Sequence, residues 1–287
     1  VTEREKMMVS KERRIEIFED TEKRIKDSSV LSESVEDTIR QTMIYDILDP
    51  DYTPRYEEGC AVHVSKKRSF AAAADYKREH PKDIVCVLNF ASATNPGGGV
   101  KNGSAAQEES LCRCSTLYPT LKTRVLWDSF YSYHRQAESV LYSDACIYTP
   151  DIIVFKTDTN EPEMMEEKDW FKTDVITCAA PNLRPYNKLN PETQKAANIT
   201  QKELLALQKN RTEQILNVAA INRVDALILG AFGCGAFYNP PEIVARAFKE
   251  SLEKYKYCFK YVEFAVYCKP AETMNYDIFE RNFRNFK

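Results

Sequence analysis

Short apolar segments recur along this chain of 287 residues, separated by longer stretches of mixed polar and apolar character. Four of these segments are almost continuously apolar, which is typical of strands buried on both faces of a sheet. A shorter segment at residues 61–64 is a fifth candidate. The other four strands are expected at residues 84–89, 173–179, 226–230 and 261–267.

Between these segments, apolar residues recur at the spacing of amphipathic helices. Thr200 can cap a long helix that runs to about residue 222, and Pro240-Pro241 can open the next one. Further helices are expected at residues 3–27, from Ser32 or Ser34 to residue 48, and at residues 69–78.

Buried strands that alternate with helices predict an α/β sandwich with a mixed sheet. We expect a single globular unit, in which residues 1–50 form a helical extension packed on a domain at residues 51–287. The acidic stretch at residues 161–167 is expected to be a surface loop.

Composition narrows the functional classes. The formal net charge of −3 comes from mixed charges, which gives no support for general nucleic-acid binding. No apolar stretch approaches the ~20 residues of a membrane span, and the charged residues 1–14 lack the apolar core of a secretion signal. Nine scattered cysteines fit a cytoplasmic protein with reduced thiols. Cys112 and Cys114 have no second pair to complete a zinc site.

One run of residues carries most of the chemical information. Asn95 and Pro96 precede Gly97-Gly98-Gly99, and Gln107-Glu108-Glu109 follows after seven residues. Three of the eight glycines are clustered here, which indicates a sharp bend or a close approach of the backbone to another group. An amide and two carboxylates beside such a loop suggest a small polar active site.

A second glycine-bearing loop, at residues 230–239, lies between a predicted strand and a predicted helix. Backbone N–H groups in such a turn can bind an anion, for which a pyrophosphate is a natural occupant. Tyr238 stands where a dinucleotide-binding fingerprint would have its third glycine, so a Rossmann site is disfavoured. The absence of a Gly-Lys-Ser/Thr sequence disfavours a nucleoside triphosphatase.

The first run closely resembles the signature of poly(ADP-ribose) glycohydrolases, in particular the bacterial (microbial-type) branch of the macrodomain superfamily. Further segments agree with this family in order along the chain, at residues 126–131, 142–143, 147–150, 179–182, 230–237 and 264–267. The resemblance implies a macrodomain-like three-layer α/β/α sandwich that binds ADP-ribose in a cleft, with no cofactor and no metal. The expected substrates are poly(ADP-ribose) or ADP-ribosylated proteins, and the expected product is ADP-ribose.

The resemblance also implies a role for each residue of the two loops. Glu109 is expected to be the catalytic acid, while Glu108 and Asn95 bind hydroxyls of the ribose distal to adenine. Gln107 would hold the catalytic loop and the ligand, and Phe237 would pack against the distal ribose. The glycines Gly97, Gly98 and Gly99 would wrap the distal ribose and diphosphate, and the diphosphate would bind Gly233, Cys234, Gly235 and Ala236.

The chemistry of the bond supports this reading. The leaving 2′-oxygen needs a proton, so the pKa of the catalytic glutamate should be raised from about 4.3 by burial and by the neighbouring carboxylate. Because adjacent residues project in different directions, we expect Glu109 to serve as both acid and base.

Several alternatives stay open. The resemblance suggests an exo-acting enzyme, and a monomer is expected. Ala236 stands where relatives tend to have a larger aliphatic side chain, which leaves room for removal of single ADP-ribose groups instead. A non-catalytic ADP-ribose-binding protein is the remaining alternative, although such a protein has no need of the two glutamates.

Overall fold

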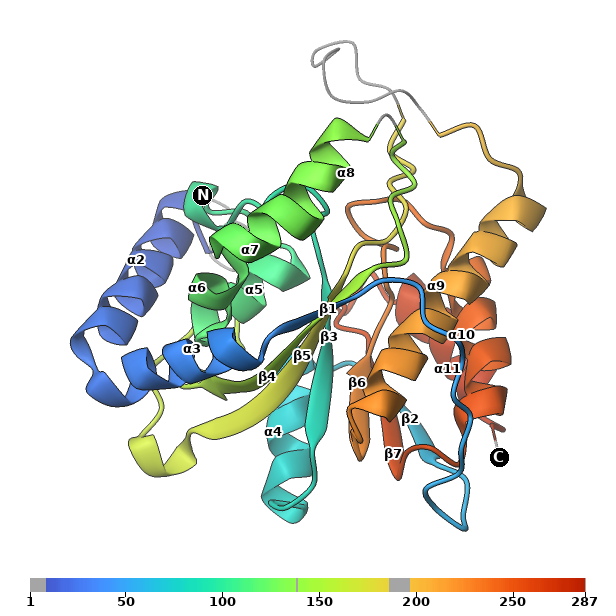
Figure 1. Cartoon of the computed structure of the whole chain (residues 1–287), viewed down its shortest axis with the longest axis horizontal. Helices are drawn as coiled ribbons and strands as arrows, with labels where there is room; N and C mark the ends of the chain where they lie inside the picture. Colours follow the sequence, from blue (N-terminus) through green and yellow to red (C-terminus); the bar gives the residue numbers. More distant parts are fainter. Residues whose placement is uncertain (1–8, 138, 186–196, 287) are drawn as a thin grey trace.

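The computed structural model describes residues 9–137, 139–185 and 197–286, and within these ranges the chain forms one mixed sheet flanked by helices (Figure 1). The order of its seven strands is β1-β4-β5-β3-β6-β7-β2. The β1–β4 and β4–β5 pairs are antiparallel and the remaining pairs are parallel. The strands are β1 (Met43–Tyr45), β2 (Ala61–Ser65), β3 (Val85–Phe90), β4 (Cys146–Val154), β5 (Phe171–Cys178), β6 (Ala226–Leu229) and β7 (Tyr261–Ala265).

Helices cover both faces of the sheet, which confirms the predicted three-layer α/β/α sandwich (Figure 1). One layer holds α2 (Lys11–Asp27), α3 (Ser29–Gln41), α4 (Ser69–Glu79), α5 (Gln107–Cys114), α6 (Leu117–Leu121), α7 (Arg124–Leu126) and α8 (Ser132–Gln136). The other layer holds α9 (Gln201–Ile221), α10 (Pro241–Tyr255) and α11 (Met274–Phe283). Short 3-10 turns occur at η1 (Val100–Asn102) and η3 (Glu167–Asp169), and a π-helical turn, η2 (Trp127–Tyr131), joins α7 to α8.

The central strand β3 contributes side chains to the two larger hydrophobic cores, one on each face of the sheet. Successive side chains of a strand point to opposite faces, so Cys86 and Leu88 pack in the core beneath α9 and α10. Val85 and Val87 belong to the core beneath α4 and α5. The continuous apolar run at residues 84–89 is therefore the signature of a strand covered on both sides.

The predicted α9 and α10 are confirmed. Thr200 caps α9, and its side chain and that of Glu203 form a reciprocal capping box. Pro241 is the first residue of α10. The predicted helix at residues 3–27 corresponds to α2 from Lys11 onward, with Ser10 as its cap, and residues 3–8 lie outside the described residues.

The second predicted helix was wrong at both ends. Ser28, rather than Ser32 or Ser34, caps α3, and the helix ends at Gln41 instead of residue 48. The reason is tertiary, because residues 43–45 pair with β4 as the edge strand β1. This strand belongs to the segment expected to be a helical extension, whose boundary at residue 50 stays a prediction.

The sheet topology places a crevice at one end of the molecule. Strands β3 and β6 are parallel neighbours, but the helices that follow them, α5 and α10, lie in opposite layers. The loops that leave the two strands therefore diverge and open a crevice beyond their carboxyl ends, where α/β sheets commonly bind ligands.

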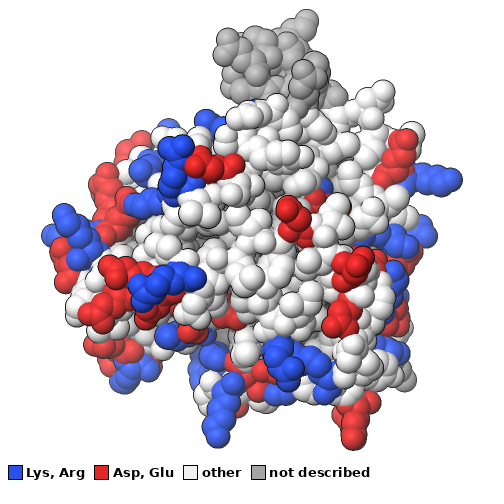
Figure 2. All heavy atoms as spheres, in the orientation of Figure 1, with Lys and Arg blue, Asp and Glu red and all other residues white. Residues whose placement is uncertain are grey.

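The outer surface carries charges of both signs. On the face drawn in Figure 2, Lys and Arg side chains intermix with Asp and Glu around the margins, and the described part of this face has no broad field of one sign. None of the helices in the described ranges is long and apolar enough to cross a membrane.

Candidate active site

The glycine run bends the chain where it leaves β3. Gly97 and Gly98 have left-handed backbones, with φ of 68° and 58°. A Cβ on Gly98 would lie 2.6 Å from Glu109 Oε1 and 3.0 Å from Glu108 Oε2, and a Cβ on Gly97 would strike the Tyr118 ring. Glycine is required here because the loop backbone lies directly against the two carboxyl groups.

The two carboxyl groups begin the short helix α5 and turn toward different partners. Glu108 accepts hydrogen bonds from the Ser92 backbone N–H (2.7 Å) and from Asn89 Nδ2 (3.3 Å). Glu109 Oε1 accepts one from the Gly99 backbone N–H at 2.8 Å. The second oxygen, Glu109 Oε2, is buried and has no hydrogen-bond partner among the described residues. It is therefore the free carboxyl oxygen of the pair.

Burial has a clear electrostatic consequence at this pair. Removal from water raises the pKa of Glu108 to about 8, and the like charge of Glu109 acts in the same direction. The hydrogen bonds from Ser92 and Asn89 oppose this shift. Glu108 therefore retains a proton near neutral pH.

The second loop, at residues 230–239, is rigid for a reason that the sequence did not reveal. Asn239 is buried, and its Nδ2 donates to the carbonyl oxygens of Pro181 (2.8 Å) and Gly233 (3.2 Å). A Cβ on Gly233 would lie 2.5 Å from Ala180 Cβ, whereas one on Gly235 would meet open space. The loop is thus fixed at Gly233 and accessible at Gly235.

The two loops face each other across a continuous cleft made of two adjoining pockets. One pocket, the carboxyl pocket, has a volume of about 1060 Å³ and includes Glu108, Glu109 and Asn95 in its wall. The other, the apolar pocket, has a volume of about 360 Å³ and includes Gly235 and Tyr267. Both pockets share the wall residues Phe90, Ala105, Ala106, Ala236 and Phe237.

The sequence and the fold of this chain are similar to those of known proteins. The sequence matches the family model described as microbial-type PARG, catalytic domain, over residues 9–157, a region that contains both halves of the glycine-glutamate run. The chain belongs to the microbial-type poly(ADP-ribose) glycohydrolase (PARG) family. No curated protein matched the chain.

Solved PARG structures agree over nearly the whole chain. The enzyme from Thermomonospora curvata superposes with a TM-score of 0.80 at 28% identity, covering 94% of this chain and 99% of its own. The same enzyme bound to the inhibitor ADP-HPD gives a TM-score of 0.78 at 29% identity, with the same coverage of the two chains. The PARG from Deinococcus radiodurans in complex with ADP-ribose gives 0.71 at 31% identity, covering 87% of this chain and 96% of its own.

The residues predicted from the PARG signature are mostly brought together in the cleft. Gly98, Gly99, Asn95 and both glutamates line the carboxyl pocket, and Gln107, Gly233 and Gly235 line the apolar pocket. Gly97 and Cys234 line neither pocket. Gly97 packs against Tyr118, and Cys234 packs against the core beneath α9 and α10.

Two polar side chains of the PARG signature contact protein groups. Gln107 accepts from the Phe90 backbone N–H (2.9 Å) and donates to the Leu88 carbonyl (2.8 Å), so it fastens the start of α5 to the end of β3. Asn95 Oδ1 accepts from Arg135 Nη2 at 2.8 Å. Gln107 therefore fixes the start of α5, whereas Asn95 is held at the rim by Arg135.

The PARG sequence pattern did not reveal the polar groups of the apolar pocket. Asp158 has a side chain 2% exposed, with Oδ2 accepting from the Phe70 backbone N–H at 2.9 Å. Its Oδ1 has no hydrogen-bond partner among the described residues, and burial raises the pKa of Asp158. Arg68 stacks on Tyr267, with its Cζ 4.1 Å from the centroid of the ring. Arg68 and Asp158 follow no motif that could have signalled them, whereas Tyr267 ends the segment at residues 264–267 that resembles the PARG family.

Metal ligation has no candidate in the part of the chain that the structure describes. No group of three or more His, Cys, Asp and Glu side chains there is arranged to hold a metal ion. The nine cysteines are all free.

Proposed function

We propose that this protein hydrolyses the ribose–ribose O-glycosidic bonds of poly(ADP-ribose) and releases ADP-ribose. The observation that carries the proposal is the position of Glu109. Its Oε1 is held by the Gly99 backbone N–H at 2.8 Å, and its buried Oε2 is unpartnered beside the carboxyl pocket. A carboxyl group fixed on one side and free on the other is suited to transfer a proton to a bound sugar.

The two pockets match the two halves of an ADP-ribose unit. The apolar pocket suits adenosine, because Asp158 Oδ1, which lies 3.9 Å from Arg68 Nη1 and has no hydrogen-bond partner among the described residues, can accept a hydrogen bond from an exocyclic amino group. The diphosphate would cross the shared wall at Ala236 and Phe237, next to the accessible backbone at Gly235. The distal ribose would then lie in the carboxyl pocket beside Glu109.

One carboxyl group can perform both halves of the reaction. Glu109 would donate its proton to the leaving 2′-oxygen as the bond to the anomeric carbon breaks through an oxocarbenium-like transition state. The resulting carboxylate would then take a proton from the water that attacks the anomeric carbon. Glu108 would orient the sugar, and the hydrogen bonds that it accepts from Ser92 and Asn89 hold it in place.

Finer features of the activity are proposals of the same kind. We expect release of ADP-ribose from chain ends, by a monomer. The free state of all nine cysteines supports action in the reducing cytoplasm.

A gel and chromatography assay tests the function. The protein is incubated with poly(ADP-ribosylated) and with mono(ADP-ribosylated) protein, and the released nucleotides are separated by size. We expect ADP-ribose monomers from the polymer and a persistent mono(ADP-ribose) signal. Loss of the single groups would favour the mono(ADP-ribosyl) hydrolase alternative, release of oligomers would contradict exo action, and binding without turnover would leave only an ADP-ribose-binding protein.

A further inference from the structure

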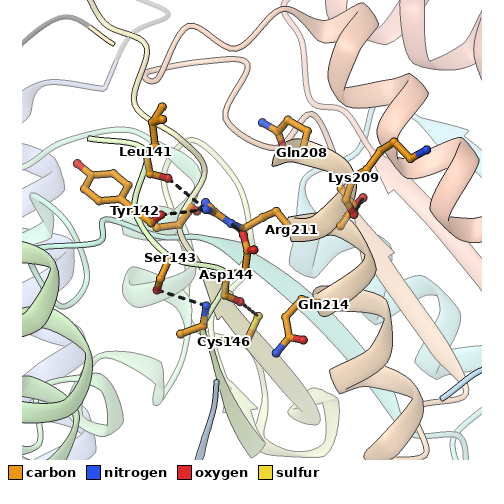
Figure 3. Close-up of polar contacts among 12 residues, drawn as sticks. Leu141, Tyr142, Ser143, Asp144, Cys146, Gln208, Lys209, Arg211 and Gln214 are labelled. Atoms are coloured by element: carbon orange, nitrogen blue, oxygen red, sulfur yellow. Dashed lines mark hydrogen bonds and ion pairs between the residues drawn. The ribbon is translucent and has the colours of Figure 1, made fainter. Parts of the chain in front are cut away.

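A buried arginine lies behind the carboxyl pocket. Arg211 projects from α9, and its side chain is 1% exposed. Figure 3 shows it pointing into the segment at residues 141–144, where its Nε pairs with Asp144 Oδ1 at 2.5 Å. Its Nη2 donates to the carbonyl oxygens of Leu141 (3.1 Å) and Tyr142 (3.3 Å).

The same guanidinium also contacts the end of β5. Arg211 Nη1 donates to the carbonyl oxygen of Ala179, which directly follows that strand. A planar guanidinium can serve several carbonyl groups and one carboxylate at once, which a lysine ammonium cannot do with the same geometry. Arg211 therefore ties three parts of the chain together: α9, the end of β5 and the segment at residues 141–144.

This connection constrains Tyr142. Tyr142 has a left-handed backbone with φ of 57°, a conformation that non-glycine residues adopt only when their surroundings impose it. Its carbonyl oxygen faces Arg211, and in Figure 3 its ring points away from the guanidinium. The ring centroid lies 5.7 Å from that of His134 and 6.2 Å from that of Phe237.

The contacts of Arg211 matter for function because the Tyr142 ring lies in the wall of the carboxyl pocket. Tyr142, His134 and Phe237 all line the carboxyl pocket, and Phe237 also borders the apolar pocket. We propose that Arg211 is a positioning residue, which holds the Tyr142 ring against Phe237 as the wall of the distal-ribose site. The inference rests on the proposed function, because that function places the distal ribose in this pocket.

The test compares two nucleotides that differ by the distal ribose. The affinities of ADP-ribose and of ADP are measured by isothermal titration for the unsubstituted protein and for Arg211→Lys. Arg211→Lys keeps the charge beside Asp144 but loses the planar array of donors. We expect about tenfold weaker ADP-ribose binding, the scale of one lost aromatic contact, with ADP affinity unchanged within about twofold.

A matched control lies at the other end of the sheet. Arg55 also combines an ion pair, with Asp225, and hydrogen bonds to two carbonyl groups, those of Val224 and Cys258. None of these residues lines either pocket of the cleft. Arg55→Lys should reduce thermal stability while leaving both nucleotide affinities unchanged at temperatures where the protein stays folded.

A double-mutant cycle then asks whether Arg211 acts through Tyr142. Tyr142→Gly removes the ring at a position where glycine is unstrained, and it should weaken ADP-ribose binding but not ADP binding. Arg211→Lys added to Tyr142→Gly should produce no further loss of ADP-ribose affinity. Equal loss of both nucleotides, or ADP-ribose affinity unchanged in Arg211→Lys, would overturn the proposal.

Two outcomes remain to be separated. If Arg211→Lys does not fold, Asp144→Asn replaces it, because it removes the charge that orients the guanidinium toward the carbonyl groups of Leu141 and Tyr142. A change in the ADP-ribose to ADP affinity ratio in Asp144→Asn supports the proposal, and an unchanged ratio contradicts it. If the unsubstituted protein does not bind ADP-ribose, the proposed function fails, and this inference fails with it.

Discussion

At the residue scale, Gly98 and the two glutamates act as one unit. A side chain on Gly98 would occupy the space of both carboxyl groups, so the left-handed turn and the buried pair require each other. The glycines were expected to let the backbone wrap a ligand. That stays a prediction, and the same glycines also let the backbone pack against Tyr118, the carboxyl groups and Ser104 inside the protein.

The raised pKa of Glu108 predicts a pH dependence of stability. Between its unfolded pKa of 4.5 and its folded pKa of about 8, the folded protein holds a proton that the unfolded chain has lost. The free energy of unfolding should therefore fall as pH rises through this window, by up to about 1.4 kcal/mol per pH unit from this proton. Urea unfolding at pH 5, 6, 7 and 8 should show a flatter dependence in Glu108→Gln.

The exposed Glu58 provides the control for that series, since Glu58→Gln should leave the pH dependence as it is in the unsubstituted protein. Parallel curves for Glu108→Gln and the unsubstituted protein would show that Glu108 does not hold the proton.

At the element scale, α2 packs against the outer side of the loop at residues 97–103. Arg14 Nε donates to the Gly103 carbonyl at 2.6 Å, and a Cβ on Gly103 would lie 2.4 Å from the Lys11 carbonyl oxygen. Phe18 packs edge-on against Tyr118 with ring centroids 5.0 Å apart, and Tyr118 lies against Gly97. The helix thus contacts one end of this loop directly and the other end through Tyr118, and the Gly99 N–H of the same loop holds Glu109.

The hydrogen bond from Arg14 to the Gly103 carbonyl predicts that a residue of α2 affects kcat. Arg14→Ala should lower kcat by about tenfold with little change in KM, because a charge-assisted hydrogen bond of about 1.5–3 kcal/mol no longer holds the loop. Steady-state release of ADP-ribose measures both constants. Arg24→Ala, which removes an exposed ion pair with Asp20 on the same helix, should leave kcat unchanged. An equal loss in both variants would assign the effect to the stability of α2.

Some strands and helices could be predicted from their local sequence pattern, whereas others depend on contacts with distant parts of the chain. The continuous apolar runs of β3 and β6 could be predicted because strands covered on both faces need no partner information. Strand β4 could not, since Thr149-Pro150-Asp151 interrupts its apolar pattern and its register with β5 shifts there. Helix α5 has only eight residues, so its apolar periodicity is too short to detect.

At the scale of the whole molecule, the fold assembles a cleft from segments that no local pattern connects. The carboxyl half could be predicted because its glycines and glutamates lie within 15 residues of one another. The groups that complete the apolar half, Arg68, Asp158 and Tyr267, approach one another only after the sheet forms. Asn239 and Arg211 likewise act through distant carbonyl groups, which sequence spacing cannot reveal.

The most direct test of the account is the behaviour of Glu109→Gln, which keeps the shape of the side chain and removes its ability to transfer a proton. ADP-ribose affinity, measured by isothermal titration, should stay within about twofold of that of the unsubstituted protein, while release of ADP-ribose from poly(ADP-ribose) should fall by about a hundredfold or more. Retained turnover in Glu109→Gln would contradict the assignment of Glu109 as the catalytic acid.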